Sequence, residues 1–291
     1  MKTMKFMTKK CFGGTAGTIS AAGAALGLVT LGSSLSAQTY TPDNWVVDPY
    51  SPNANFTVSG ATSTSPTYTD NGSATGSLYG YSSLGATLSL VNIGDNITYS
   101  GQFSLAGNVN NSNLQFRFGL LYAGSSANDT GWLGYDIGLP NAAGQPGLYE
   151  RNNPNTGVFA SGTGATTVSS GDTAFTGPLA AGTYDFSLSV TLSSSTSETI
   201  NWSVTGINSN PYIYTGSYVN TTLTTEGSLN FDSVGFLGGG STFASASTSD
   251  VISFGNPTVT LVPEPSVLAL AGVGLTVLLG RYRRSRPSAG R

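Results

Sequence analysis

The sequence has no histidine, a single cysteine and few charged residues, which make up 9% of its 291 positions. Without imidazole there is no Ser-His-Asp or Cys-His nucleophile pair, no His-ligated zinc and no histidine acid or base. The one thiol, Cys11, lies in an N-terminal segment that we expect to be removed. The rest of the chain then has no disulfide and no thiolate nucleophile, and its fold must be held by non-covalent contacts.

Positive charge is almost confined to the two ends of the chain. All four lysines precede residue 11, and five of the seven arginines follow residue 280. Between Gln38 and Val262, only Arg117 and Arg151 oppose thirteen acidic residues, which gives that part a net charge of −11. Nothing there can neutralise a run of phosphates, so the sequence predicts no nucleic-acid partner.

The basic N-terminus is followed by an apolar stretch. Residues 12–31 carry no charge, and a cluster of small residues ends at Ala37. This order predicts a secretory signal peptide over residues 1–37, cleaved between Ala37 and Gln38, with the Sec translocon and signal peptidase as partners. An uncleaved anchor helix is the alternative.

The C-terminus repeats this arrangement in reverse. Residues 266–280 are fifteen uncharged and mostly apolar positions, and an arginine cluster follows them. As a helix they span about 22 Å. This is shorter than the roughly 30 Å hydrocarbon core, and snorkelling arginines extend the reach. The positive-inside rule places both basic ends in the cytoplasm, so residues 38–262 are predicted to be translocated.

The last thirty residues resemble the PEP-CTERM sorting domain of Gram-negative bacteria. The resemblance is carried by Val262-Pro263-Glu264-Pro265, the apolar segment behind it and the terminal arginines. It implies that residues 263–291 are a sorting segment read by an exosortase, with transient anchoring in the inner membrane and delivery to the envelope or extracellular matrix, often beside exopolysaccharide and biofilm. The implied retention signal is Arg281, Arg283 and Arg284. An ordinary tail anchor is the alternative.

Between these ends the sequence alternates apolar and polar residues with a period of two, which is typical of strands. The clearest runs are 97–105, 114–120, the hairpin 183–205, 212–218, 229–237 and 251–261. No apolar stripe of helical period appears. We therefore predict an all-β fold, a single antiparallel jelly-roll sandwich over 38–262. Residues 51–76 would be a loose arm or short edge strands, and the glycine-rich stretches 157–171 and 238–240 would be loops.

This central part is similar to laminin-G/concanavalin-like jelly rolls. The similarity is carried by the segments 115–120, 134–136, 183–205, 231–236 and 252–260. It implies that the N- and C-terminal strands lie together and that the domain binds sugars or calcium. Asp129 and Asp232 are the calcium candidates, since hard cations take oxygen ligands.

Catalysis is not expected. Glycoside hydrolysis needs two carboxylates at a fixed separation, and Asp136, Glu150, Glu198 and Glu226 are the available candidates. No two acidic residues lie two positions apart, however, and residues 38–262 contain no lysine to serve as a lyase base.

Carbohydrate binding needs aromatic planes and a few fixed polar groups. Residues 130–136 and 149–151 supply both, and Arg117 should lie on the sheet face opposite Phe116 and Phe118. The candidate sugar-binding residues are Trp132, Tyr135, Asp136, Tyr149, Glu150, Arg151 and Arg117. The alternatives are that Trp132 and Tyr135 are packing residues and that Glu150 and Arg151 form a surface ion pair. Trp202 is predicted in the core.

The leading interpretation is an exported structural protein of the envelope or extracellular matrix, without catalysis and without a cofactor. A carbohydrate-binding module that takes extracellular polysaccharide is the alternative, and a glycoside hydrolase is the third.

Overall fold

The structure, a computed structural model, describes residues 36–47, 56–70, 78–109, 116–124, 132–139, 147–151, 165–168, 174–176, 179–223, 227–238 and 250–264. Residues 37–264 form one compact unit. The predicted signal and sorting helices lie outside the described residues. Within the described ranges, no helix has the length and apolar character needed to cross a membrane.

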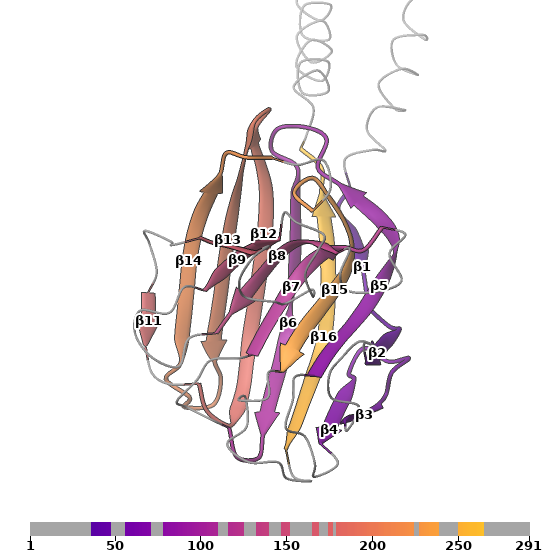
Figure 1. The fold of residues 1–291 in the computed structure, drawn as a ribbon, viewed down its shortest axis with the longest axis vertical. Helices are drawn as coiled ribbons and strands as arrows, with labels where there is room; N and C mark the ends of the chain where they lie inside the picture. The colour runs from indigo at the N-terminus through magenta and orange to yellow at the C-terminus, as the bar shows by residue number, and fades with distance from the viewer. Residues whose placement is uncertain are drawn as a thin grey trace, which may run out of the picture. The chain divides into compact units, whose positions relative to one another are not determined.

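The described strands form two sheets, seen as two layers in Figure 1. In the nine-stranded sheet the order is β11 (Ala174–Thr176), β14 (Ile213–Asn220), β13 (Ser197–Gly206), β12 (Gly182–Ser194), β6 (Asn96–Ala106), β16 (Val251–Val262), β4 (Thr67–Asp70) and β3 (Phe56–Ser59). The ninth strand, β1 (Gln38–Tyr40), pairs with β16. The seven-stranded sheet has the order β10 (Ala165–Val168), β9 (Leu148–Arg151), β8 (Leu133–Gly138), β7 (Phe116–Tyr122), β15 (Asn230–Gly238), β5 (Leu78–Ser89) and β2 (Trp45–Val47).

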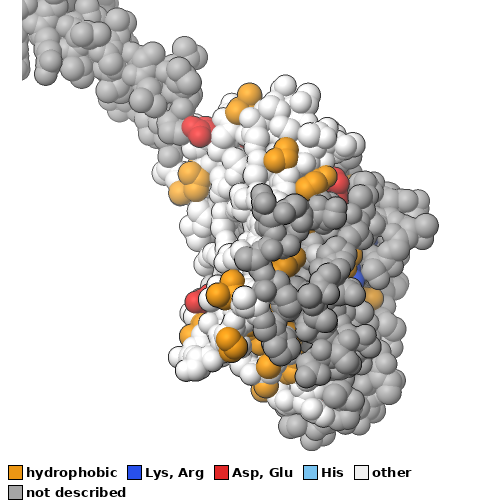
Figure 2. All heavy atoms as spheres, turned by 90° about the vertical axis from the view of Figure 1, so that its left-hand side faces the viewer, with side chains coloured by type: hydrophobic (Ala, Val, Ile, Leu, Met, Phe, Trp, Pro, Cys, Tyr) orange, Lys and Arg blue, Asp and Glu red, His pale blue; other side chains and the backbone are white. Residues whose placement is uncertain are grey.

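Neighbouring strands in both sheets are antiparallel, which confirms the predicted all-β, jelly-roll-like sandwich. The main apolar core lies between the sheets and is rich in aromatic rings. Phe118 of one sheet contacts Phe186 of the other with ring centroids 4.7 Å apart, and Phe103 contacts Phe116 at the same distance. Trp202 is buried, as predicted. The face drawn in Figure 2 shows few charged side chains among its described residues.

The alternating runs become long central strands. β6, β12, β13 and β16 follow the predicted runs closely, and β7 begins at Phe116, with 111–115 outside the described residues. The prediction for the glycine-rich stretch 157–171 is wrong in part, because residues 165–168 form β10 and pair with β9. Residues 51–76 contain β3 and β4, so the interpretation as short edge strands holds there.

β5 was not predicted, because small residues occupy its inner face. Gly80 and Ser82 are buried, whereas Tyr79 and Tyr81 lie on the outer face and are half-buried. A Cβ on Gly80 would lie 2.2 Å from the ring of Phe236. The Phe236 ring of β15 therefore fills the core next to Gly80, in the space that a side chain at position 80 would occupy.

The first and last described strands lie together, as the jelly-roll similarity implies. β1 pairs with β16 in a register that places Gln38 opposite Leu261 and Tyr40 opposite Val259. Residues 38 and 262 are therefore at the same end of the sandwich, and the neighbouring strands can be followed in Figure 1.

Candidate functional site

The outer face of the seven-stranded sheet carries both positive side chains of the sandwich. Arg117 of β7 and Asp136 of β8 lie there with Tyr149 and Arg151 of β9, and we call these four residues the outer patch. The strand register pairs Asp136 with Tyr149 and places Arg117 opposite Gly138. Because side chains alternate along a strand, all four point away from the core that holds Phe116, Phe118 and Tyr135. This confirms the predicted orientation of Arg117.

The four side chains of the outer patch contact one another or nearby backbone. Arg117 Nη1 lies 3.8 Å from Asp136 Oδ1, and Arg117 Cζ lies 4.1 Å from the centroid of the Tyr149 ring. Arg151 Nε donates to the carbonyl oxygen of Trp132 at 3.0 Å. Gly138 makes the arrangement possible, because a Cβ there would lie 3.0 Å from Tyr149 Cε2. The Arg117 guanidinium is thus held between a carboxylate and an aromatic face.

Asp136 is the unusual member of the outer patch. Its side chain is 1% exposed, and neither carboxylate oxygen accepts a hydrogen bond from the described part of the chain. Burial raises the pKa of Asp136 to about 6, while Arg117 and Arg151 act in the opposite direction and favour the ionised form. The carboxylate therefore offers two acceptor oxygens with no hydrogen-bond donor assigned to them.

An apolar strip adjoins the outer patch. Leu121, Trp132 and Leu237 are buried together, with Tyr79 and Tyr81 packed against them. The Tyr81 and Trp132 rings meet edge to face with centroids 4.7 Å apart. Trp132 is 3% exposed, so it packs on the outer face of the sheet as the packing alternative predicted.

Two of the candidate sugar-binding residues lie on the opposite face. Tyr135 and Glu150 point between the sheets, where they meet Glu198 and Asn220 of the nine-stranded sheet, and Ser228; we call these five residues the inter-sheet cluster. The Tyr135 hydroxyl donates to Glu198 Oε1. Asn220 Nδ2 donates to Glu150 Oε1 at 2.8 Å and to the Tyr135 hydroxyl at 2.6 Å. The predicted surface ion pair of Glu150 with Arg151 is wrong, because the two buried side chains lie on opposite faces of β9.

Burial governs the charge of the inter-sheet cluster. It raises the pKa of Glu198 to about 8, against the opposing effect of the hydrogen bonds from Tyr135 and Asn220. Burial also raises the pKa of Glu150, with the same two partners opposing it. Glu198 is completely buried, and its Oε2 accepts no hydrogen bond from the described residues. Burial therefore favours the protonated form of Glu198.

Only one of the two calcium candidates lies in the described part of the chain. Asp129 lies outside the described residues. The Asp232 carboxylate accepts hydrogen bonds from the backbone nitrogens of Ala123 at 2.8 Å and Gly124 at 2.9 Å. In the described ranges, no group of three or more acidic, histidine or cysteine side chains could hold a metal ion.

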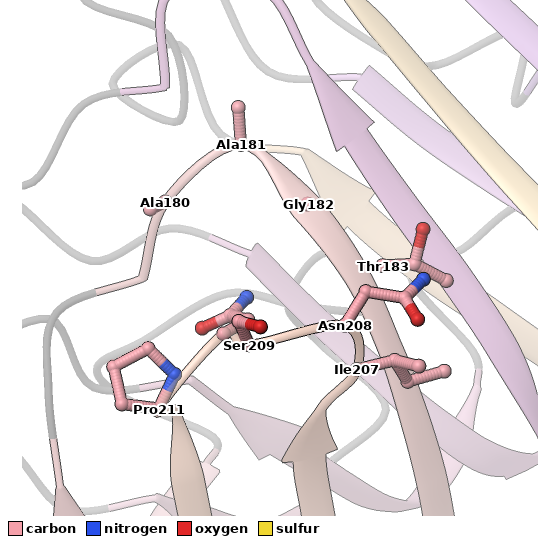
Figure 3. Close-up of a pocket in the computed structure, with 9 residues that line it drawn as sticks. Ala180, Ala181, Gly182, Thr183, Ile207, Asn208, Ser209 and Pro211 are labelled. Atoms are coloured by element: carbon pink, nitrogen blue, oxygen red, sulfur yellow. The ribbon is translucent and has the colours of Figure 1, made fainter.

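A separate hollow lies where β12 begins and the β13–β14 turn ends, and Figure 3 shows its lining. It has a volume of about 460 Å³ and is lined by residues 180–183 and 207–211. Two of the lining residues, Asn208 and Ser209, have positive φ angles of 54° and 70°. No titratable side chain lines it, so it offers only backbone, hydroxyl and amide groups.

The predicted processing positions are described only in part. Ala37 and Gln38 are exposed next to the end of β16, and Glu264 is exposed where the described chain ends. Pro265 and the predicted retention signal Arg281, Arg283 and Arg284 lie outside the described residues, as does Glu226.

Comparison with known proteins assigns no family. No family model and no curated protein matches the sequence. Among solved structures, the chain is similar to arcelin-5, a lectin-like defence protein from Phaseolus vulgaris, with 11% identity, 78% of this chain and 97% of that chain covered, and a TM-score of 0.41. It is also similar to a PL-14 alginate lyase from Aplysia kurodai, with 12% identity, coverages of 79% and 99%, and a TM-score of 0.43. A protein of unknown function from Shewanella oneidensis matches with 11% identity, coverages of 85% and 96%, and a TM-score of 0.39. The class of protein is an antiparallel β-sandwich, and no residue role is carried over from these structures.

Proposed function

We propose that the chain is a carbohydrate-binding protein whose site is the outer patch. The observation that carries the proposal is Asp136, a buried carboxylate with two oxygens that accept no hydrogen bond from the described residues, held beside Arg117 and the Tyr149 ring. Sugar hydroxyls are donors that a carboxylate binds strongly in a low dielectric, and arginine donates to sugar oxygens. The half-buried Tyr149 ring adds an apolar surface for the sugar.

The burial of the outer patch affects how it would bind. Arg117 and Asp136 are 4% and 1% exposed, so a sugar reaches them only after this face opens. Binding that requires a conformational change is slow, and we expect association rate constants below ~10⁵ M⁻¹ s⁻¹.

The outer patch favours carbohydrate binding over the other two interpretations. A purely structural role in the envelope or matrix rests on composition alone, and no arrangement of side chains in the described chain points to it specifically. The hydrolase interpretation has a carboxyl pair in Glu150 and Glu198, which share Asn220 Nδ2. That pair lies between the two sheets, so a glycan would have to separate the sheets to reach it, whereas the outer patch lies on the outer face of one sheet.

Asp136→Asn is expected to weaken polysaccharide binding by about tenfold or more, since a hydrogen bond to a charged group contributes about 1.5–3 kcal/mol. The measurement is the affinity of the full chain for a panel of neutral and acidic polysaccharides. Asp185→Asn is the matched control, because Asp185 is an exposed carboxylate on β12 of the other sheet. Equal affinities of Asp136→Asn and wild type, or retention on no polysaccharide, would contradict the proposal.

The proposal includes export and sorting by an exosortase to the cell envelope or matrix. It is supported by the charge pattern of the sequence and by the pairing of Gln38 with Leu261, which brings both predicted processing sites to one end of the sandwich. Replacing Pro263, Glu264 and Pro265 together by alanine is expected to abolish C-terminal processing and delivery. Immunoblotting of cell fractions measures both, and processing as in wild type would overturn the sorting part alone.

A further inference from the structure

Exposed apolar side chains gather at the end of the sandwich where the described chain begins and ends. Five large hydrophobic residues are exposed in the described ranges. Val91 (73% exposed) and Ile93 (60%) form the tip of the loop between β5 and β6, and Val262 (43%) ends β16. Val219 (51%) lies in the same row, since the register runs from Val262 through Asn96, Thr191 and Thr199 to Val219. Only Ile213 lies at the opposite end of these strands, paired with Thr205.

One buried carboxylate ties the apolar loop to the last described residues. Asp95 Oδ2 accepts from the backbone nitrogens of Val91 at 2.8 Å and Asn92 at 2.7 Å. Asp95 Oδ1 accepts from the backbone nitrogen of Glu264 at 2.9 Å. The side chain of Glu264 lies over Gly94, where a Cβ would be 1.8 Å from Glu264 Cγ. The loop tip and the position at which the chain leaves the sandwich are therefore held together.

Both predicted membrane segments connect to this same end. Residues 12–31 precede Gln38 and residues 266–280 follow Glu264, and Gln38 is paired with Leu261. Before either segment is removed, a chain with both segments in a bilayer would have this end of the sandwich closest to the lipid. No other part of the described surface has this combination of exposed apolar residues and adjoining predicted membrane segments.

We infer that this end of the sandwich contacts a lipid surface, with Val91 and Ile93 entering the interfacial region, Val262 at the end of β16, and Val219 four strands further along the same row. Transfer of these side chains out of water is favourable, and the contact is held at the membrane for as long as a flanking segment remains attached. The sandwich has a net charge of −11, and its two arginines lie in the outer patch, so the lipid is zwitterionic rather than anionic. The inference rests on the proposed export topology.

The test uses the full chain with Cys11→Ser in phosphatidylcholine vesicles. Single cysteines Val91→Cys and Ile93→Cys carry a polarity-sensitive fluorophore, and Ile213→Cys is the matched control at the opposite end. We expect blue-shifted emission at 91 and 93, and quenching by quencher-bearing lipid that is severalfold stronger than at 213.

The possible outcomes distinguish a failure of the lipid contact from a failure of the proposed export topology. A chain that floats with the vesicles but shows equal lipid quenching at 91, 93 and 213 overturns the lipid contact alone. A blue shift without lipid quenching indicates a protein contact and also overturns it. A chain that does not float with the vesicles overturns both the inference and the export topology. Glycan binding is measured separately and does not depend on these outcomes.

Discussion

The protein is expected to lose stability as the pH rises from about 4.5 to about 8, and Glu198→Gln should remove the part of this loss that Glu198 causes, while Asp136 and Glu150, whose pKa values burial also raises, keep theirs. Burial raises the pKa of Glu198 from 4.5 to about 8, so across this range the folded state keeps a proton that the unfolded state releases. Stability falls with pH wherever the folded state binds more protons. At about 1.4 kcal/mol per pH unit, the loss approaches 5 kcal/mol.

Urea unfolding at pH 5 and pH 8 measures this effect. Wild type and Glu198→Gln should have similar free energies of unfolding at pH 5, because Glu198 is protonated in the folded wild type at that pH. At pH 8 the variant should be the more stable of the two. The matched control is Asp185→Asn, which removes an exposed carboxylate on β12 rather than a buried one. A Glu198→Gln profile that falls as steeply as wild type would contradict the assigned proton.

The second expectation concerns the ion pair of the outer patch. Arg117→Met should destabilise the protein by about 3–5 kcal/mol, because it leaves the 1%-exposed Asp136 without its nearest opposite charge. The pKa of Asp136, already raised by burial, should rise further, since Arg117 favours its ionised form. The destabilisation should therefore be larger at pH 8 than at pH 5.

A double-mutant cycle tests this pair. Combining Arg117→Met with Asp136→Asn should recover much of the lost stability, because an amide replaces the uncompensated charge. Free energies of unfolding for wild type, both single variants and the double variant give the coupling energy. A coupling energy near zero at pH 8 would show that Asp136 does not depend on Arg117.

Local patterns in the sequence were enough to predict the central strands. The run from Tyr184 to Leu192 alternates strictly, and every second residue is buried in β12. The same reasoning missed β5, because Gly80 lies on its inner face and Phe236 from a distant strand fills the space. The residue that packs against Gly80 lies more than 150 positions later in the chain, so the sequence around β5 does not reveal it.

The candidate site was only partly predictable for a related reason. Arg117 lies opposite its aromatic neighbours, as predicted, and Asp136, Tyr149 and Arg151 lie with it on the outer face. Tyr135 and Glu150 were grouped with them, although they face the core. Which residues share a face across strands depends on register, and the pairing of Asp136 with Tyr149 is set by tertiary contacts.

The sequence by itself determined that histidine chemistry is absent, that an acidic middle lies between two basic ends, and that the middle forms strands. Composition and period-two alternation can be read directly from the sequence, without knowledge of the fold. Only the tertiary structure decided that Glu150 and Glu198 share Asn220 between the sheets, and that both arginines of the sandwich lie on one face. Only the tertiary structure brought Glu264 to Asp95, 169 positions earlier. These contacts follow from long-range strand pairing and close packing, which join residues that are far apart in the chain.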